Sequence, residues 1–164
     1  MASFGATKNG GADVALRYAL YVAATAGGSG DAAAANGGWI DRRGFNWLKA
    51  GVAYRAVLGV GQTLSLAAKI QDADDSSGAG AADFGTAMAN AVVATGGSGG
   101  TTETGVAEID LDLTMARPWI RLVATPDLNR ANTDTAVITG QIALGGKDGF
   151  NPVSARANPA EPLG

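Results

Sequence analysis

Hydrophobic and polar residues alternate along several stretches of this chain, and the alternation predicts β-strands. In residues 13–24, bulky apolar side chains alternate with a second set that is mostly small or polar. The helix capped by Asp13 is the competing interpretation, because Ala, Leu and Arg favour helices, but five matched alternations favour the strand. We expect its apolar face to consist of Val14, Leu16, Tyr18, Leu20 and Val22.

Two more alternating runs, residues 52–58 and 64–70, flank a turn that contains Gly59 and Gly61. Their closeness in the chain predicts an antiparallel pair. Residues 39–49 mix aromatic and charged side chains around Gly44, which predicts a short strand or a turn.

The second half of the chain has the clearest pattern. Ile109, Leu111 and Leu113 are expected to face the core, whereas Glu108, Asp110, Asp112 and Thr114 face solvent. Pro118 cannot donate to a strand ladder, so the next strand, residues 119–125, starts after it. A last strand covers residues 135–144, with Ile138, Ile142 and Leu144 on one side. Residues 84–95 are ambiguous, and Val92 and Val93 are their best strand candidates.

Seven or eight short strands joined by Gly-rich and Asp-rich turns predict an all-β fold, an antiparallel β-sandwich of jelly-roll type. We place the sandwich domain at residues 13–146, after an N-terminal extension, 1–12. Residues 147–164 contain three prolines and no periodicity, which favours an extended C-terminal arm over a packed element. A frayed terminus without a role is the alternative.

Composition narrows the functional classes. Among the 164 residues there is no cysteine and no histidine, so disulfides, thiolate or imidazole metal sites and most nucleophilic relays are excluded. A net charge of −3 without a basic stripe argues against a nucleic-acid partner. No apolar run approaches the roughly 18–20 residues of a membrane helix, and the first ten residues lack a secretion signal. We therefore expect a non-enzymatic protein that needs no cofactor and contacts no membrane.

The predicted core is lean, because glycine occurs 25 times and large aliphatic side chains are few. Apolar burial at roughly 25 cal/mol per Å² has to offset the entropy lost by each ordered residue. Such a chain gains stability by docking onto neighbouring proteins.

Two acidic clusters are candidates for chemistry. Asp72, Asp74 and Asp75 could ligate a hard cation, but the loop lacks the later Glu and the central Gly of an EF-hand, so a solvated turn is favoured. The carboxylates of Glu108, Asp110 and Asp112 could be the catalytic pair of a glycosidase. A position on the solvent-exposed face of a strand explains these acidic residues more simply.

The aromatic and basic residues offer a binding surface. The three tryptophans could form a platform for sugar rings, or they could be packing residues. The arginines near them suit interface ion pairs or cation stacking, with ordinary surface charge as the alternative. The candidate interface residues are Trp39, Arg42, Arg43, Trp47, Phe150, Val153 and Leu163, and the other members of these groups are Trp119, Arg117 and Arg121.

Four segments carry a resemblance to a known family. They are WIDRRGFN (39–46), GQTLSLAAKIQDADD (61–75), TGVAEIDLDLTMARPWIRLVATPD (104–127) and DTAVITGQIALGG (134–146). Together they resemble the head decoration, or cement, proteins of tailed bacteriophages. None of the four is a catalytic signature.

The resemblance implies a β-sandwich that is assembled in the host cytoplasm and sits on the outer surface of the capsid. Its partner there would be the major capsid protein, and its oligomeric state would be a trimer. The resemblance implies no ligand site. A carbohydrate-binding or host-attachment module displayed on the virion remains the alternative, because of the three tryptophans.

Overall fold

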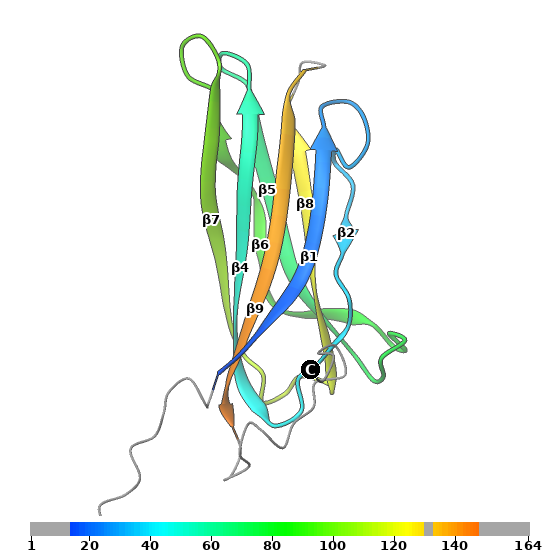
Figure 1. Cartoon of the computed structure of the whole chain (residues 1–164). Helices are drawn as coiled ribbons and strands as arrows, with labels where there is room; N and C mark the ends of the chain where they lie inside the picture. Colours follow the sequence, from blue (N-terminus) through cyan, green and yellow to red (C-terminus); the bar gives the residue numbers. More distant parts are fainter. Residues whose placement is uncertain (1–13, 130–132, 148–164) are drawn as a thin grey trace, which may run out of the picture.

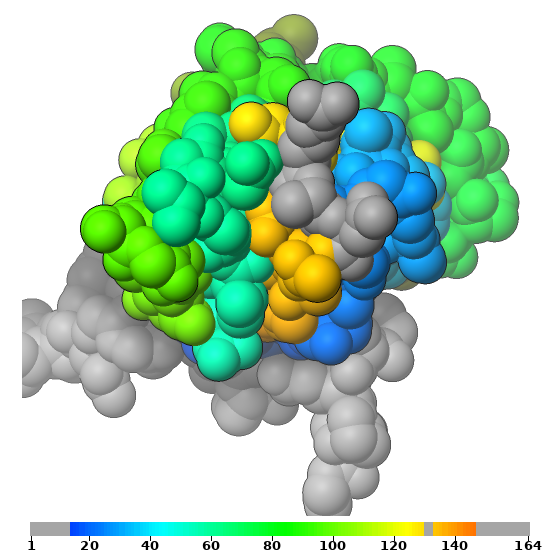
Figure 2. Space-filling model, turned by 90° about the horizontal axis from the view of Figure 1, so that it is seen from above, coloured from blue at the N-terminus to red at the C-terminus, as the bar shows by residue number. Residues whose placement is uncertain are grey.

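The computed structural model describes residues 14–129 and 133–147, which form two antiparallel β-sheets packed face to face (Figure 1). Sheet A consists, in spatial order, of β1 (Ala15–Thr25), β9 (Thr135–Lys147), β4 (Phe45–Leu58) and β7 (Thr101–Asp112). Sheet B consists of β2 (Ala35–Asn36) and β3 (Ile40–Asp41), followed by β8 (Trp119–Leu128), β5 (Thr63–Ala73) and β6 (Ala82–Thr95). Seen from above, β4, β9 and β1 lie side by side as one layer (Figure 2).

The strand pairing is nested and defines a jelly roll. β1 pairs with β9, β2 and β3 pair with β8, β4 pairs with β7, and β5 pairs with β6. If β2 and β3 count as two parts of one strand, the described chain is an antiparallel ribbon with the β5–β6 hairpin at its tip. Successive pairs of the ribbon lie in opposite sheets, which is the jelly-roll arrangement. The predicted fold class is therefore confirmed, and the helix alternative for residues 13–24 is wrong because β1 is a strand.

The core lies between the two sheets, as the period-two pattern predicts. Ile138, Ile142 and Leu144 of β9 are fully buried, on the predicted side. Alanines fill much of the rest, so the sheets approach closely: a Cβ on Gly140 of sheet A would overlap Leu122 Cδ2 of sheet B. The largest fully buried side chains are Leu48, Val52, Leu58, Leu64, Leu66, Ile70, Leu113, Ile120, Leu122, Ile138, Ile142 and Leu144.

The predicted pairing of residues 52–58 with residues 64–70 is wrong. Both segments are strands, but β4 belongs to sheet A and β5 to sheet B. The turn between them crosses from one sheet to the other, and its backbone bonds to Gly96, as Gly61 N donates to Gly96 O and Gly96 N donates to Gln62 O. Both strands bury alternate residues in the same core from opposite sides, so their patterns match without any pairing.

The predicted apolar face of β1 is only half correct. The β1–β9 register shifts between Tyr18 and Leu20, which is the signature of a β-bulge. After the bulge Leu20 faces the core, as expected. Before it, Leu16 and Tyr18 point to solvent and are 60% and 66% exposed, while Ala15 is buried instead. The extra residue inverts the alternation, which a strict period of two cannot reveal.

Several strand boundaries differ from the sequence expectations. Residues 39–49 contain the expected short strand β3, but β4 already begins at Phe45 and runs for 14 residues. The ambiguous residues 84–95 all lie in β6, and β9 extends to Lys147, the first residue of the expected arm. β8 starts directly after Pro118, as predicted.

The N-terminal extension, 1–12, and residues 148–164 of the arm lie outside the described residues. Within the part that is described, there is no helix long and apolar enough to cross a membrane.

Candidate functional site

The outer face of sheet A, the side turned away from sheet B, carries most of the exposed large hydrophobic side chains of the described residues. Leu16, Tyr18 and Tyr21 project from β1 and are 59–66% exposed. Strand pairing extends the row of Tyr21 through Thr139 and Ala53 to Val106 of β7. The exposed hydrophobic side chains on this face are those of Leu16, Tyr18, Tyr21, Trp47, Val57 and Val106, with Val14 just before β1.

The bulge in β1 creates this surface. It turns Leu16 and Tyr18 outward at one end of the strand, and Tyr21 follows on the same face beyond the bulge. Between this ridge and β7, the outer face carries small side chains such as Ala143, Gly51 and Ala53. The longer polar side chains of Lys49, Arg55 and Gln141 lie among these small residues, so the hydrophobic ridge of β1 borders a mixed surface.

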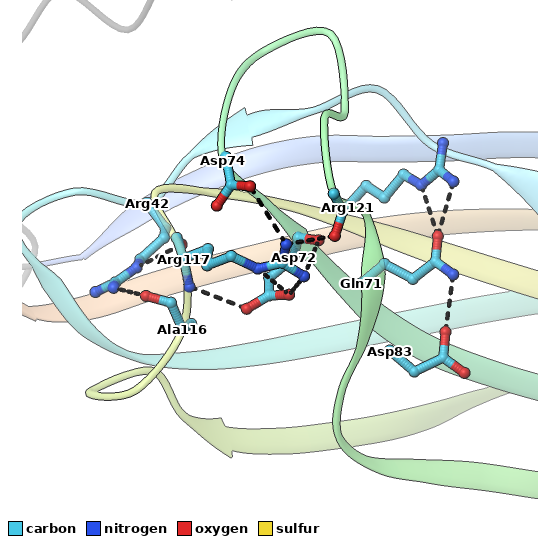
Figure 3. Close-up of polar contacts among 9 residues, drawn as sticks. Arg42, Gln71, Asp72, Asp74, Asp83, Ala116, Arg117 and Arg121 are labelled. Atoms are coloured by element: carbon cyan, nitrogen blue, oxygen red, sulfur yellow. Dashed lines mark hydrogen bonds and ion pairs between the residues drawn. The ribbon is translucent and has the colours of Figure 1, made fainter.

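The outer face of sheet B has a different character, because a chain of polar contacts crosses it (Figure 3). The Arg121 guanidinium donates from Nε and Nη2 to Gln71 Oε1, at 2.9 and 2.7 Å. Gln71 Nε2 in turn donates to Asp83 Oδ1 at 2.8 Å, and Lys69 Nζ donates to Asp83 Oδ2 at 2.9 Å. The side chains thus satisfy one another and leave a polar, hydrated surface.

Asp72, a candidate calcium ligand, is instead part of an ion pair that closes one end of the sandwich (Figure 3). Its side chain is 8% exposed, and its carboxylate accepts bonds from Arg117 N, Nε and Nη2 at 2.6–3.0 Å. Arg117 also donates to Gly80 O and lies 3.7 Å from Asp74. The interpretation of this acidic cluster as a solvated turn therefore fails for Asp72, because Arg117 donates to both of its carboxylate oxygens.

The other two members of this acidic cluster belong to the loop between β5 and β6. Asp75 holds the loop by accepting bonds from the hydroxyl and amide of Ser77 and from Ala79 N. No group of residues suited to a metal ion occurs in the described part of the chain.

The candidate interface arginines contact the protein itself. Arg42 donates to the carbonyl oxygens of Arg117, Ala116 and Phe45, so it holds the segment between β7 and β8. Arg43 is more exposed and forms a bidentate pair with Asp41, with its shortest bond at 2.6 Å. The contacts of Arg42 with Arg117 and Ala116 were not visible in the sequence, because these partners lie 75 and 74 residues away.

The three tryptophans do not form one platform. The Arg121 guanidinium stacks on Trp39 at 4.5 Å from the ring centroid, and the Arg43 guanidinium lies 5.8 Å from that of Trp119. Trp47 lies on the other sheet, on the outer face of β4, and is 40% exposed. The expected cation stacking is thus present at two tryptophans. Phe150, Val153 and Leu163 lie outside the described residues.

The acidic residues of β7 face solvent, as predicted. Lys49 bridges them from β4, at 2.9 Å from Glu108 and 3.5 Å from Asp110. The hydroxyl and amide of Thr114 donate to Asp112 and lower the pKa of that carboxyl. A general acid needs a raised pKa, so this environment does not suit Asp112 as the general acid of a glycosidase.

We expect the stability of the protein to fall below about pH 4, because three carboxyls have lowered pKa values in the folded state. Hydrogen bonds lower the pKa of Asp75 (chiefly from Ser77), of Asp83 (chiefly from Gln71, then Lys69) and of Asp112 (from Thr114). A lowered folded-state pKa means that the stabilisation is complete above the ordinary value of 3.8 and is lost as the pH falls through the lower one. The melting temperature, followed by thermal unfolding between pH 7 and pH 2, measures this dependence of stability on pH.

The variant Asp83→Asn is the control for the acid effect. It should be less stable than the wild type at neutral pH and should lose less stability on acidification. A wild-type melting temperature that stays constant or rises down to pH 2 would contradict the assignment.

The described residues therefore form a jelly-roll β-sandwich with an exposed hydrophobic ridge on the outer face of sheet A and a network of polar contacts on the outer face of sheet B. No model of a protein family matches the sequence, and no curated protein matches it either. Among solved structures, a chain of the Gx strain of infectious bursal disease virus is 15% identical, with a TM-score of 0.44 over 86% of this chain and 34% of that one. A chain of the VP2 subviral particle of infectious bursal disease virus is 13% identical, with a TM-score of 0.44 over 87% of this chain and 35% of that one. This chain thus spans about a third of the length of those chains.

Proposed function

We propose that this chain is a structural virion protein that decorates and stabilises the outer surface of a tailed-phage capsid. In this proposal it binds across subunits of the major capsid protein, as a trimer, through the outer face of sheet A. The observation that carries the proposal is the gathering of exposed hydrophobic side chains on that one face, with Leu16, Tyr18 and Tyr21 as its ridge. The sequence resemblance to head decoration proteins supplies the capsid as the partner.

The contrast between the two faces supports docking through sheet A. Contiguous exposed apolar surface is typical of sites where another protein binds. Burying about 100 Å² on each of Leu16, Tyr18 and Tyr21 contributes roughly 7 kcal/mol before the cost of association is subtracted. The outer face of sheet B offers little by comparison, because Arg121, Gln71 and their neighbours already bind one another.

A protein that binds the assembled shell more tightly than free subunits stabilises the shell by mass action. The role requires packing surface and no reactive group, which agrees with a chain free of cysteine and histidine. The lean, alanine-rich core agrees with it as well, since docking adds buried area that the isolated domain lacks.

The proposal is tested by mixing the purified full chain with undecorated heads of the phage that encodes it. We expect the free chain to sediment as a small oligomer and to pellet with the heads in a saturable manner. Decorated heads should also withstand higher temperatures than bare ones. A strictly monomeric chain that does not pellet with the heads would overturn the proposal.

A further inference from the structure

Trp47 is held flat on the outer surface of sheet A by two glycines. Strand pairing places it between Asp112 of β7 and Gly145 of β9. A Cβ on Gly145 would overlap the indole ring and lie only 2.8 Å from Cη2, and a Cβ on Gly146 would lie 2.7 Å from Cδ1. One face of the ring therefore rests directly on the backbone of β9. The ring is nevertheless 40% exposed, so part of its surface remains open to solvent.

An open, shallow groove of about 580 Å³ runs beside this ring, where β4 begins and β7 ends. Its lining combines the indole with amide, hydroxyl and carboxylate groups. The lining residues are Asn46, Trp47, Leu48, Asp110, Leu111, Asp112 and Thr114.

The polar groups of the groove are fixed in place. Asp112 Oδ1 accepts bonds from Thr114 N at 2.7 Å and from Thr114 Oγ1 at 2.5 Å, which orients the carboxylate. Lys49 lies 3.5 Å from Asp110 and offsets part of the negative charge. The groove thus presents acceptor oxygens beside an aromatic surface that a rigid backbone supports.

We propose that this groove binds a neutral saccharide, with one sugar ring stacked on the indole of Trp47. A sugar ring has an apolar face that suits the indole and hydroxyl groups at its rim that donate to carboxylates such as those of Asp112 and Asp110. Phosphate and other anions are repelled by these carboxylates. A quaternary ammonium ion is less suited, because Lys49 already neutralises part of the charge and a single aromatic ring makes no cage. The groove lies on the same outer face of sheet A as the β1 ridge, beside β7, and a saccharide site goes beyond the proposed capsid-binding role.

The experiment titrates the full chain with neutral oligosaccharides built from glucose, galactose, mannose or N-acetylglucosamine. Isothermal calorimetry measures binding, and tryptophan emission reports on the ring. We expect at least one saccharide to bind and to shift the emission. Trp47→Ala should weaken that binding by about tenfold or more, which corresponds to the loss of one stacking contact.

Two further variants test the role of the carboxylate and provide a control. Asp112→Asn keeps the shape of the side chain but removes its charge, and it should weaken binding several-fold without loss of the fold. Trp39→Phe is the matched control, because Trp39 lies under Arg121 on the other sheet, and it should bind as the wild type does. Melting curves of all three variants separate lost binding from lost structure.

Three outcomes would overturn the saccharide site. One is the absence of binding across the whole panel, and another is undiminished binding by a folded Trp47→Ala variant. The third is binding of tetramethylammonium at Trp47 without binding of any saccharide. Head binding by Trp47→Ala is measured separately, so failure of this site is distinguishable from failure of the proposed capsid-binding role.

Discussion

The variant Gly37→Ala is expected to lower the free energy of unfolding by about 3 kcal/mol, enough to reduce the melting temperature by roughly 5–10 °C. Gly37 lies between β2 and β3, where its N–H donates to Leu122 O of β8 at 2.8 Å. A Cβ at this position would lie 2.9 Å from Leu122 O and even closer to Ala19 O of β1. Both obstacles are backbone atoms that cannot rotate away, so the edges of the two sheets would have to separate.

The neighbouring glycine provides the matched control. A Cβ on Gly38 would meet no atom within 4 Å, so Gly38→Ala should remain within about 0.5 kcal/mol of the wild type. Urea unfolding followed by tryptophan emission measures both variants. Equal stability of the two variants would show that the close approach of β1 and β8 at Gly37 does not exist as described.

Alternation in the sequence was sufficient to predict most strands and the buried side of many of them. In β7 and β9 the pattern is regular, and Ile109, Ile138 and Ile142 are buried as expected. Alternation with a period of two shows which residues share one face of a strand. It does not show which sheet that strand joins. The β4 and β5 patterns therefore suggested a hairpin, whereas these strands face each other across the core.

The apolar ridge on β1 could not be predicted, because it depends on a single extra residue. The sequence at Ala19 carries no residue type that marks a bulge. The register shift beside Ala19 nevertheless exchanges the buried and exposed sides of the preceding residues. Strict alternation would have buried Leu16 and Tyr18, which instead form the most conspicuous surface feature. A hydrophobic pattern that looks ideal for a core can thus belong to side chains that are exposed to solvent.

The polar contacts could not be predicted, because they join residues that are far apart in the sequence. Arg117 and Asp72 are 45 residues apart, and the ion pair exists because the end of β5 and the segment before β8 meet at one end of the sandwich. Trp47 and Asp112 were each noted as candidates for binding or chemistry. Only the β4–β7 register brings them together beside one groove.

A charge on the apolar ridge should weaken docking strongly. Tyr18 is 66% exposed at the centre of the ridge, so Tyr18→Asp disturbs little of the fold but would bury an unpaired carboxylate in the interface. We expect affinity for undecorated heads to fall by about a hundredfold, which corresponds to roughly 2.7 kcal/mol and is typical of an interface hot spot. Ala67→Asp is the matched control, because Ala67 occupies the outer side of β5 in sheet B, opposite Thr125.

Head binding by these two variants, at equal thermal stability, is the most direct measurement of the claim that sheet A is the docking surface. The account predicts that the Ala67→Asp protein pellets with heads as the wild type does, while the Tyr18→Asp protein stays in the supernatant. Retained binding by Tyr18→Asp together with loss of binding by Ala67→Asp would contradict it, since the shell would then contact sheet B.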